Sequence, residues 1–229
     1  MNRNIRPLFA ALTIAACLTS TGAWAAASVD QAVLGLQQQW EQAMYRVPAK
    51  DQGAALAKLD RDAQAVAARY PGQAEPLIWE AISLSSHAKI AGGLKGLGMA
   101  KDARDLLIKA EQIDPKAMNG SVYTSLGGLY AKVPGWPVGF GDKDKAEGYF
   151  KKALSMNPNG IDPNYLYADF LFDQHRYKEA EQVLEHALKA PPRPQRQLSD
   201  QGRTREVRAL LAEVRTKLAD AGAKSFAGG

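Results

Sequence analysis

Residues with acid–base or metal-binding chemistry are few and scattered in this sequence. His87, His175 and His186 stand far apart and at different positions of the helical period, so they do not form a predicted metal site. Asp169 and Asp173 lie one helical turn apart, where two carboxylates can share a proton in a dry groove, but nothing nearby completes an acid–base site. The motifs His-Glu-x-x-His and Gly-x-Ser-x-Gly are missing. The sequence therefore predicts no enzyme, no cofactor and no metal site.

A glycine-rich stretch occupies residues 91–99, Ala-Gly-Gly-Leu-Lys-Gly-Leu-Gly-Met. Glycine-rich loops that precede a helix can hold phosphate through their backbone amides. Here no strand pattern comes first, and neither the Walker nor the dinucleotide-binding spacing is present. We interpret residues 92–99 instead as a flexible connection between two helices.

The elements that would position a site follow a repeated pattern of small and large apolar residues. Each copy ends in a helix that carries alanine, a large apolar residue, a second alanine and then proline, which lets two antiparallel helices approach closely. This pattern is typical of tetratricopeptide repeats (TPRs), and three copies in phase predict an all-α, TPR-like, right-handed solenoid of helical hairpins with a C-terminal capping helix. The three sets are Ala103, Leu107, Ala110 and Pro115; Ala146, Phe150, Ala153 and Pro158; and Ala180, Leu184, Ala187 and Pro192.

The preceding helices carry further matching positions. Tyr123, Leu126, Gly127 and Tyr130 fit the first helix of the middle copy, and Trp79 fits that of the copy before it. Residues 74–192 are thus expected to hold three TPR-like units, with extended inter-helix loops at 92–99 and 132–142. Residues 26–73 form a helical pair that is a degenerate repeat or a cap. Residues 193–229 form a basic connector, a capping helix and a flexible tail after Ala221.

Helix starts are predicted from capping residues. Ser28 with Gln31, and Asp144 with Glu147, have the spacing of capping boxes, and Asp162 before Pro163 is expected to cap the next helix.

The first 25 residues have the order of a secretory signal peptide. Arg3 and Arg6 precede an apolar run over residues 8–18, and Ala23-Trp24-Ala25 fits a cleavage site, which predicts a periplasmic protein that begins at Ala26. The alternative is a lipid anchor on Cys17, because residues 14–17 resemble a lipobox. Cys17 is the only cysteine, so no disulfide is available.

The charge of the chain is mildly basic. The formal net charge of +5 falls to +3 when Arg3 and Arg6 leave with the signal peptide, too little to predict nucleic-acid binding. Residues 189–217 hold eight bases and three acids. We interpret this stretch as a solvated helix face, with a dock for an acidic partner or anionic headgroups as the alternative.

Two sets of residues are candidates for binding. The first is the groove that the first helices of successive hairpins line, where polar and aromatic side chains are mixed. The second is the loop at residues 133–141, whose apolar side chains either fold back onto the hairpin or anchor a partner. The predicted groove residues are Glu80, His87, Thr124, Lys132, Tyr165, Asp169 and Phe172, and the predicted interaction loop carries Trp136, Val138 and Phe140.

A family resemblance rests on longer motifs. Residues 134–143, Pro-Gly-Trp-Pro-Val-Gly-Phe-Gly-Asp-Lys, with residues 145–147, 157–165 and 190–194, resemble exported TPR proteins known as the T component of TPR-associated TRAP transporters. The resemblance implies a helical periplasmic protein or lipoprotein that assists ligand uptake. It also implies a periplasmic solute-binding protein as the partner, and a homo-oligomer with a pore or groove near the repeats.

The prediction is an exported, non-catalytic scaffold for protein–protein interaction. The first alternative is a carrier of a small-molecule ligand, which requires an enclosed apolar cavity near Tyr165 and Trp136. A remote alternative is an envelope enzyme, which requires a tight cluster of titratable residues.

Overall fold

The computed structural model describes residues 20–227 of the chain. Residues 1–19, with Cys17 and most of the predicted signal peptide, lie outside the described residues. The described part is helical and contains no strand. None of its helices is both long enough and apolar enough to cross a membrane. The helices are α1 (Ser20–Tyr45), α2 (Ala49–Arg69), α3 (Ala74–Ala91), α4 (Gly93–Ile113), α5 (Ala117–Lys132), α6 (Lys143–Met156), α7 (Ile161–Asp173), α8 (Tyr177–Ala187) and α9 (Gln197–Ala227), with a short 3-10 helix, η1, at Pro194–Arg196.

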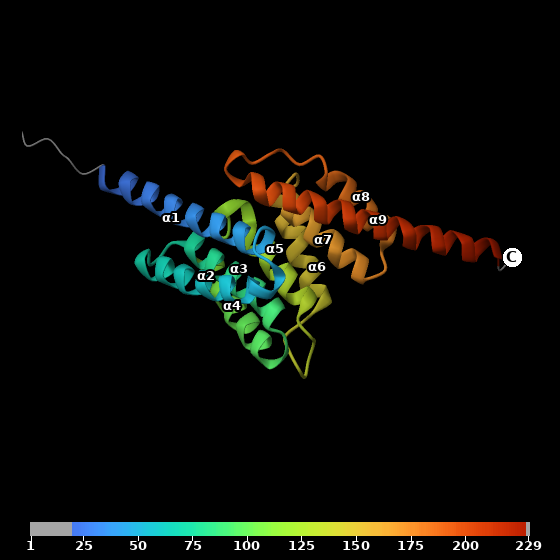
Figure 1. Ribbon diagram of the computed structural model, residues 1–229, viewed down its shortest axis with the longest axis horizontal. Coiled ribbons are helices and arrows are strands. Elements are labelled where there is room, and N and C mark those ends of the chain that lie inside the picture. The colour runs from blue at the N-terminus through green and yellow to red at the C-terminus, as the bar shows by residue number, and fades with distance from the viewer. Residues whose placement is uncertain (1–19, 228–229) are drawn as a thin grey trace, which may run out of the picture.

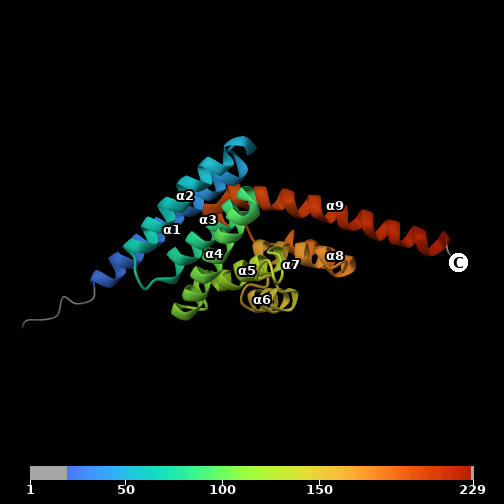
Figure 2. The same ribbon diagram turned by 90° about the horizontal axis from the view of Figure 1, so that it is seen from below.

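The helices pair as successive hairpins, α1 with α2, α3 with α4, α5 with α6, and α7 with α8, and α9 packs on the last pair. The first helix of each hairpin also contacts the first helix of the next, from α1 through α3, α5 and α7 to α9. In both views α9 runs beside α7 and α8 and then continues past them (Figures 1 and 2). This architecture confirms the predicted all-α, TPR-like fold.

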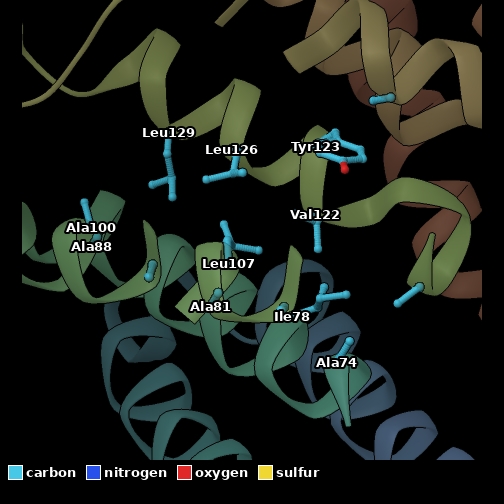
Figure 3. Close-up of a cluster of buried hydrophobic side chains, with 14 residues drawn as sticks. Ala74, Ile78, Ala81, Ala88, Ala100, Leu107, Val122, Tyr123, Leu126 and Leu129 are labelled. Carbon is cyan, nitrogen blue, oxygen red and sulfur yellow. The ribbon is translucent and has the colours of Figure 1, made fainter. Parts of the chain in front are cut away.

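The alanine positions of the repeat pattern form the contact between the helices of each hairpin. Ala103 and Ala110 of α4, Ala146 and Ala153 of α6, and their counterparts in α8 are all buried. The large apolar residue between each pair of alanines is also buried, and Figure 3 shows Leu107 of α4 below Leu126 and Leu129 of α5. Small side chains let the backbones approach, and the larger one fills the remaining space.

Gly127 shows why the middle hairpin needs a residue without a side chain. A Cβ at this position would lie 2.8 Å from two ring carbons of Phe150, which is fully buried in α6. At the next residue, Gly128, an added Cβ would meet no atom within 4 Å. Close approach of α5 to α6 therefore requires glycine at 127 but not at 128.

The N-terminal pair packs against the rest of the chain through tryptophan. Trp40 of α1 lies edge-on to Trp79 of α3, with ring centres 6.3 Å apart, and its Nε1 donates a 2.8 Å hydrogen bond to Ser86. Leu56 and Leu59 of α2 are buried in the same cluster. The pair thus shares a continuous core with the first TPR-like unit.

The first and last helices also contact each other near the middle of the molecule. Arg196, at the end of η1, forms an ion pair with Glu41 of α1, and both side chains are nearly buried. Further along, Gly202 of α9 lies against Tyr45, whose ring would overlap a Cβ at position 202. The contact between α1 and α9 thus joins the first and last members of the row formed by α1, α3, α5, α7 and α9.

Several predicted boundaries are wrong. Residues 93–99 belong to α4, so the expected loop at 92–99 is only the turn at Gly92 and Gly93, both with positive φ. Helix α1 begins at Ser20 rather than near Ser28, and α9 extends to Ala227, past the predicted end at Ala221.

Two predicted caps are also wrong. The cap of α6 is Asp142 instead of Asp144, because the Asp142 carboxylate accepts from the backbone amides of Asp144 and Lys145. Asp162 lies inside the first turn of α7, after Gly160 as the cap residue.

Candidate interaction surfaces

The inner face, formed by the first helices α1, α3, α5, α7 and α9, carries a row of polar and aromatic side chains. Lys132 at the end of α5 places its Nζ 2.8 Å from Asp169 and 2.5 Å from Asp173 of α7. Partial burial acts to lower the pKa of Lys132, but the hydrogen bonds to the two carboxylates outweigh it and raise the pKa. The Lys132 and Asp173 side chains are each about half exposed. Three predicted groove and acid–base residues are therefore together and accessible.

The row continues from α7 to α9. The guanidinium of Arg203 lies 4.5 Å from the centre of the Tyr165 ring, a cation–π contact. Burial raises the pKa of the Tyr165 phenol, with Arg203 opposing the shift. Burial also raises the pKa of Tyr45, again against the nearby charge of Arg203. These neutral phenols flank a fixed cation that is itself nearly buried, so this part of the face is mainly aromatic.

Asp162 links this row to the connector. It accepts from Arg193 at 2.7 Å and from Arg203 at 2.8 Å. Burial acts against ionisation, but the charges of Arg203 and Arg193 outweigh it and hold the pKa of Asp162 well below its ordinary value. The network fixes α9 against α7 and so sets the shape of the inner face.

The other predicted groove residues lie in helix contacts. His87 is buried, and its Nδ1 is 2.6 Å from Asp60 of α2. Burial raises the pKa of Glu80. The charge of Lys109 opposes this shift and the charge of Asp60 adds to it. Thr124 is buried on α5. Phe172 is half-buried, with its ring centre 5.5 Å from that of Tyr177 at the start of α8.

A buried polar cluster between α2 and α3 was not predicted from the sequence. Asp60 accepts a 2.5 Å hydrogen bond from Ser83 on one oxygen, and its other oxygen faces His87. The spacing of Ser83 and His87, four residues apart on one helix, signals a shared face. Nothing in the spacing identifies Asp60, which is 27 residues away from His87. The arrangement satisfies buried polar groups at the contact between two successive hairpins.

The loop between α5 and α6 separates its predicted residues. Phe140 folds back, edge-on to Tyr130 with ring centres 5.4 Å apart and under the Arg104 guanidinium at 4.5 Å. Trp136 and Val138 point outward and are 90% and 60% exposed. The loop is the olive trace that projects from the lower edge in Figure 1. The folded-back interpretation thus holds for Phe140, whereas Trp136 and Val138 are exposed and stay candidates for partner contact.

The loop is closed by hydrogen bonds between its own backbone groups. Gly141 N–H donates to the Pro134 carbonyl at 2.9 Å, and Gly139 N–H donates to Gly135 at 3.0 Å. A Cβ at Gly141 would overlap the carbonyl oxygen of Val133. The two ends of the loop therefore approach more closely than any other residue type would permit.

The arginines of residues 189–217 are largely engaged within the chain. Arg196 and Arg203 are nearly buried in ion pairs with Glu41 and Asp162, so the prediction of a solvated face is wrong for them. Arg215 is exposed, and bridges Glu181 and Glu185 of α8.

Two surface hollows lie away from the predicted sites. One, of about 320 Å³, is at the α7–α8 turn beside His175, Tyr177 and Leu218. The other, of about 600 Å³, lies between α1 and η1 and is lined mostly by glutamines. Neither is lined by Tyr165 or Trp136. Across residues 20–227 no group of three or more histidine, cysteine or acidic side chains has metal-binding geometry.

Known proteins share the fold. Residues 138–213 match the tetratricopeptide repeat family. A crystal structure of a thermophilic TPR protein from Thermus thermophilus is similar, with a TM-score of 0.55 and 19% identity over 85% of this chain and 94% of that one. No curated protein matches the sequence. The stacked hairpins, the family match over residues 138–213 and the shared fold together show an all-α, TPR-like fold.

Proposed function

We propose that this chain is an exported, non-catalytic TPR scaffold that binds a protein partner on its inner face. TPR repeats generally mediate protein–protein interactions, which supports the general class of function. The observation that carries the assignment to the inner face is the ion pair of Lys132 with Asp169 and Asp173. This ion pair joins α5 and α7, the first helices of two successive hairpins, while its side chains stay in contact with solvent.

The charge balance of this ion pair favours a partner with a basic group. Two carboxylates face one ammonium, and the Asp173 side chain is 45% exposed. A lysine or arginine side chain of the partner would complete the pairing of Asp173. The neighbouring Tyr165 ring offers aromatic contact area beside this position. An extended row of side chains of this kind is better suited to binding a protein segment than to enclosing a small ligand.

The carrier of a small molecule is the second candidate. The glutamine-lined hollow between α1 and η1 favours it, since about 600 Å³ is enough for a small ligand. However, its lining is polar and open, whereas the carrier requires an enclosed apolar cavity near Tyr165 and Trp136. We therefore rank the protein scaffold first.

The proposal also includes export from the cytoplasm and a role in transport. The order of charged, apolar and small residues before Ala26 supports a periplasmic location, with a lipid anchor on Cys17 as the alternative. The resemblance of residues 134–143 to TRAP-associated TPR proteins supports an accessory role in solute uptake, with a solute-binding protein as the partner. Cell fractionation followed by N-terminal mass spectrometry tests the location, because cleavage gives Ala26 and lipidation gives a modified Cys17.

The partner surface is tested by affinity purification from cell-envelope extract. The chain is compared with Asp173→Lys, which reverses the charge that a basic group of the partner would meet, and with the matched control Asp102→Lys. Asp102 is an equally charged, exposed residue on the second helix α4. We expect the wild type and the control to retain the same partner and Asp173→Lys to lose it.

Two results would count against this assignment. Retention of the partner by Asp173→Lys would show that the inner face is not the contact surface. Failure of the wild type to retain any protein would favour the small-molecule carrier. Circular dichroism of each variant checks that the helical fold is intact.

A further inference from the structure

One edge of the molecule collects the turns between first and second helices. We call it the turn edge and define it as residues 46–54, 88–98 and 132–145. Its three segments adjoin one another, since a Cβ at Gly53 would lie 3.9 Å from Ile90, and a Cβ at Gly139 would lie 3.3 Å from Leu97. The start of α4 and the olive loop lie on the same lower edge of Figure 1.

Large apolar side chains are exposed mainly on this edge. Of the six exposed large hydrophobic residues among those whose burial is described, four belong to the turn edge: Ile90, Leu94, Trp136 and Val138. Leu94 is 86% exposed, nearly as much as Trp136. The remaining two, Ile113 and Leu188, stand at the far ends of α4 and α8. Apolar exposure concentrated in this way marks an interaction surface.

The same edge carries an excess of positive charge. It holds seven bases against three acids, and Asp142 among the acids is occupied in capping α6. Five of the bases are exposed and form no ion pair with any residue of the described chain: Arg46, Lys50, Lys89, Lys95 and Lys143. The unpaired charge that surrounds the apolar side chains is therefore cationic.

We propose that the turn edge docks on the surface of an anionic lipid bilayer. Trp136 and Leu94 enter the interfacial region, and the surrounding lysines face the headgroups. Tryptophan is favoured at the depth of lipid headgroups, and basic residues beside apolar ones are typical of proteins that lie on membranes. The turn edge and the partner surface share Lys132, which is paired with Asp169 and Asp173. The two functions are nevertheless separable, because the proposed membrane anchors Trp136 and Leu94 belong to the α5–α6 loop and to α4 rather than to the first helices.

The shape of the edge favours lipid over a folded protein. The apolar side chains protrude from a loop tip and a helix start, and neither Trp136 nor Leu94 lines either of the two hollows. A bilayer accepts protruding side chains without a matching pocket, whereas a protein partner needs complementary shape. The loop is already closed by hydrogen bonds and by the packing of Phe140, so docking does not require it to become ordered.

Vesicle co-sedimentation tests the proposal. The protein carries Cys17→Ser, so that no lipid can be attached, and mass spectrometry verifies that it begins at Ala26. We expect binding to phosphatidylglycerol-rich vesicles, weaker binding to phosphatidylcholine vesicles, and loss of binding in high salt. Trp136→Ala with Leu94→Ala should lower the partition coefficient at least about tenfold, because two apolar anchors are lost.

Matched variants distinguish binding through the turn edge from nonspecific adsorption to lipid. Ile113→Ala with Leu188→Ala removes the two exposed hydrophobic residues outside the edge and should leave the partition coefficient unchanged. Lys89→Glu with Lys95→Glu should reduce binding to anionic vesicles, and Lys151→Glu should not. Brominated lipids should quench Trp136, whereas Trp40 and Trp79 are buried in the fold.

Two results would overturn the proposal. One is equal sedimentation of the wild type and the Trp136/Leu94 variant. The other is no binding of the wild type to anionic vesicles. If the variant then loses a protein that the wild type retains in envelope extract, the edge is a protein-docking surface instead.

Discussion

Arg196 and Glu41, 155 residues apart in the chain, form a nearly buried ion pair that joins the first helix to the connector leading into the last one. The Arg196 guanidinium also lies 5.2 Å from the centre of the Trp79 ring. This pair connects α1, α3 and the connector before α9, so the stacked hairpins are held at both ends.

Removal of one partner from this pair should destabilise the whole chain. Arg196→Met leaves Glu41 charged and buried, and we expect the free energy of unfolding to fall by about 3 kcal/mol. Urea denaturation followed by circular dichroism measures the change. Arg215→Met removes an exposed guanidinium from two carboxylates and should cost at most about 1 kcal/mol. Equal losses in the two variants would mean that the α1–α9 contact does not support the fold.

Adjacent glycines in α5 should respond oppositely to the same substitution. Gly127→Ala drives a methyl group into the buried Phe150 ring and should lower the free energy of unfolding by about 1–3 kcal/mol. Gly128→Ala meets open space in the same helix and should raise it by up to about 1 kcal/mol. Thermal unfolding of both variants checks the close α5–α6 packing, which a neutral Gly127→Ala would disprove.

Asp162 should make stability depend on acidic pH. Its pKa in the folded chain is held below the ordinary value of 3.8, so the unfolded chain takes up the proton first as the pH falls. The stabilisation is present above about pH 4 and is lost as the pH drops toward the folded value. Asp162→Asn should flatten the unfolding free energy between about pH 4 and pH 2, and should lower it at pH 7 by about 1–3 kcal/mol.

The control for this experiment is Asp102→Asn on the exposed surface of α4. It should leave the pH profile of the unfolding free energy unchanged. An Asp162→Asn profile as steep as that of the wild type would show that other carboxylates carry the acid dependence.

The two aromatic residues of the loop should separate stability from surface function. Phe140→Ala removes a ring packed against Tyr130 and Arg104, and we expect a loss of about 2 kcal/mol with faster amide exchange at Gly141. Trp136→Ala changes an exposed side chain and should alter the unfolding free energy by less than about 0.5 kcal/mol. Hydrogen exchange with mass spectrometry reports both the stability of the chain and the protection of the loop amides. Similar loop protection in the two variants would contradict the inward role of Phe140.

The helical hairpins could be predicted because their packing depends on residue size at fixed spacing. Ala146, Phe150 and Ala153 make the same contact as their counterparts in the other units, so three copies reinforce one signal. The part of the turn edge formed by the α5–α6 loop could be predicted, because Trp136 stands among prolines and glycines that exclude regular structure. Leu94 was missed, since Gly92 and Gly93 suggested a loop where the chain turns directly into α4.

Ion pairs between distant segments could not be predicted in this way. Asp162 has the local sequence of a helix cap, yet its partners Arg193 and Arg203 come from the connector and α9. Likewise, the basic composition of residues 189–217 indicated exposure, whereas burial of Arg196 and Arg203 depends on acids brought close only by the stacking of the hairpins. Composition identifies charge, but the fold decides which charges meet.

The most direct test of the inner face as a partner surface is photo-crosslinking in living cells. A benzophenone amino acid replaces Asp173 on the inner face in one strain and Lys151 on the second helix α6 in another; both side chains are solvent-accessible. We predict a protein adduct of defined mass from position 173 and none from position 151. An adduct from position 151 alone, or equal adducts from both positions, would contradict the proposed partner surface.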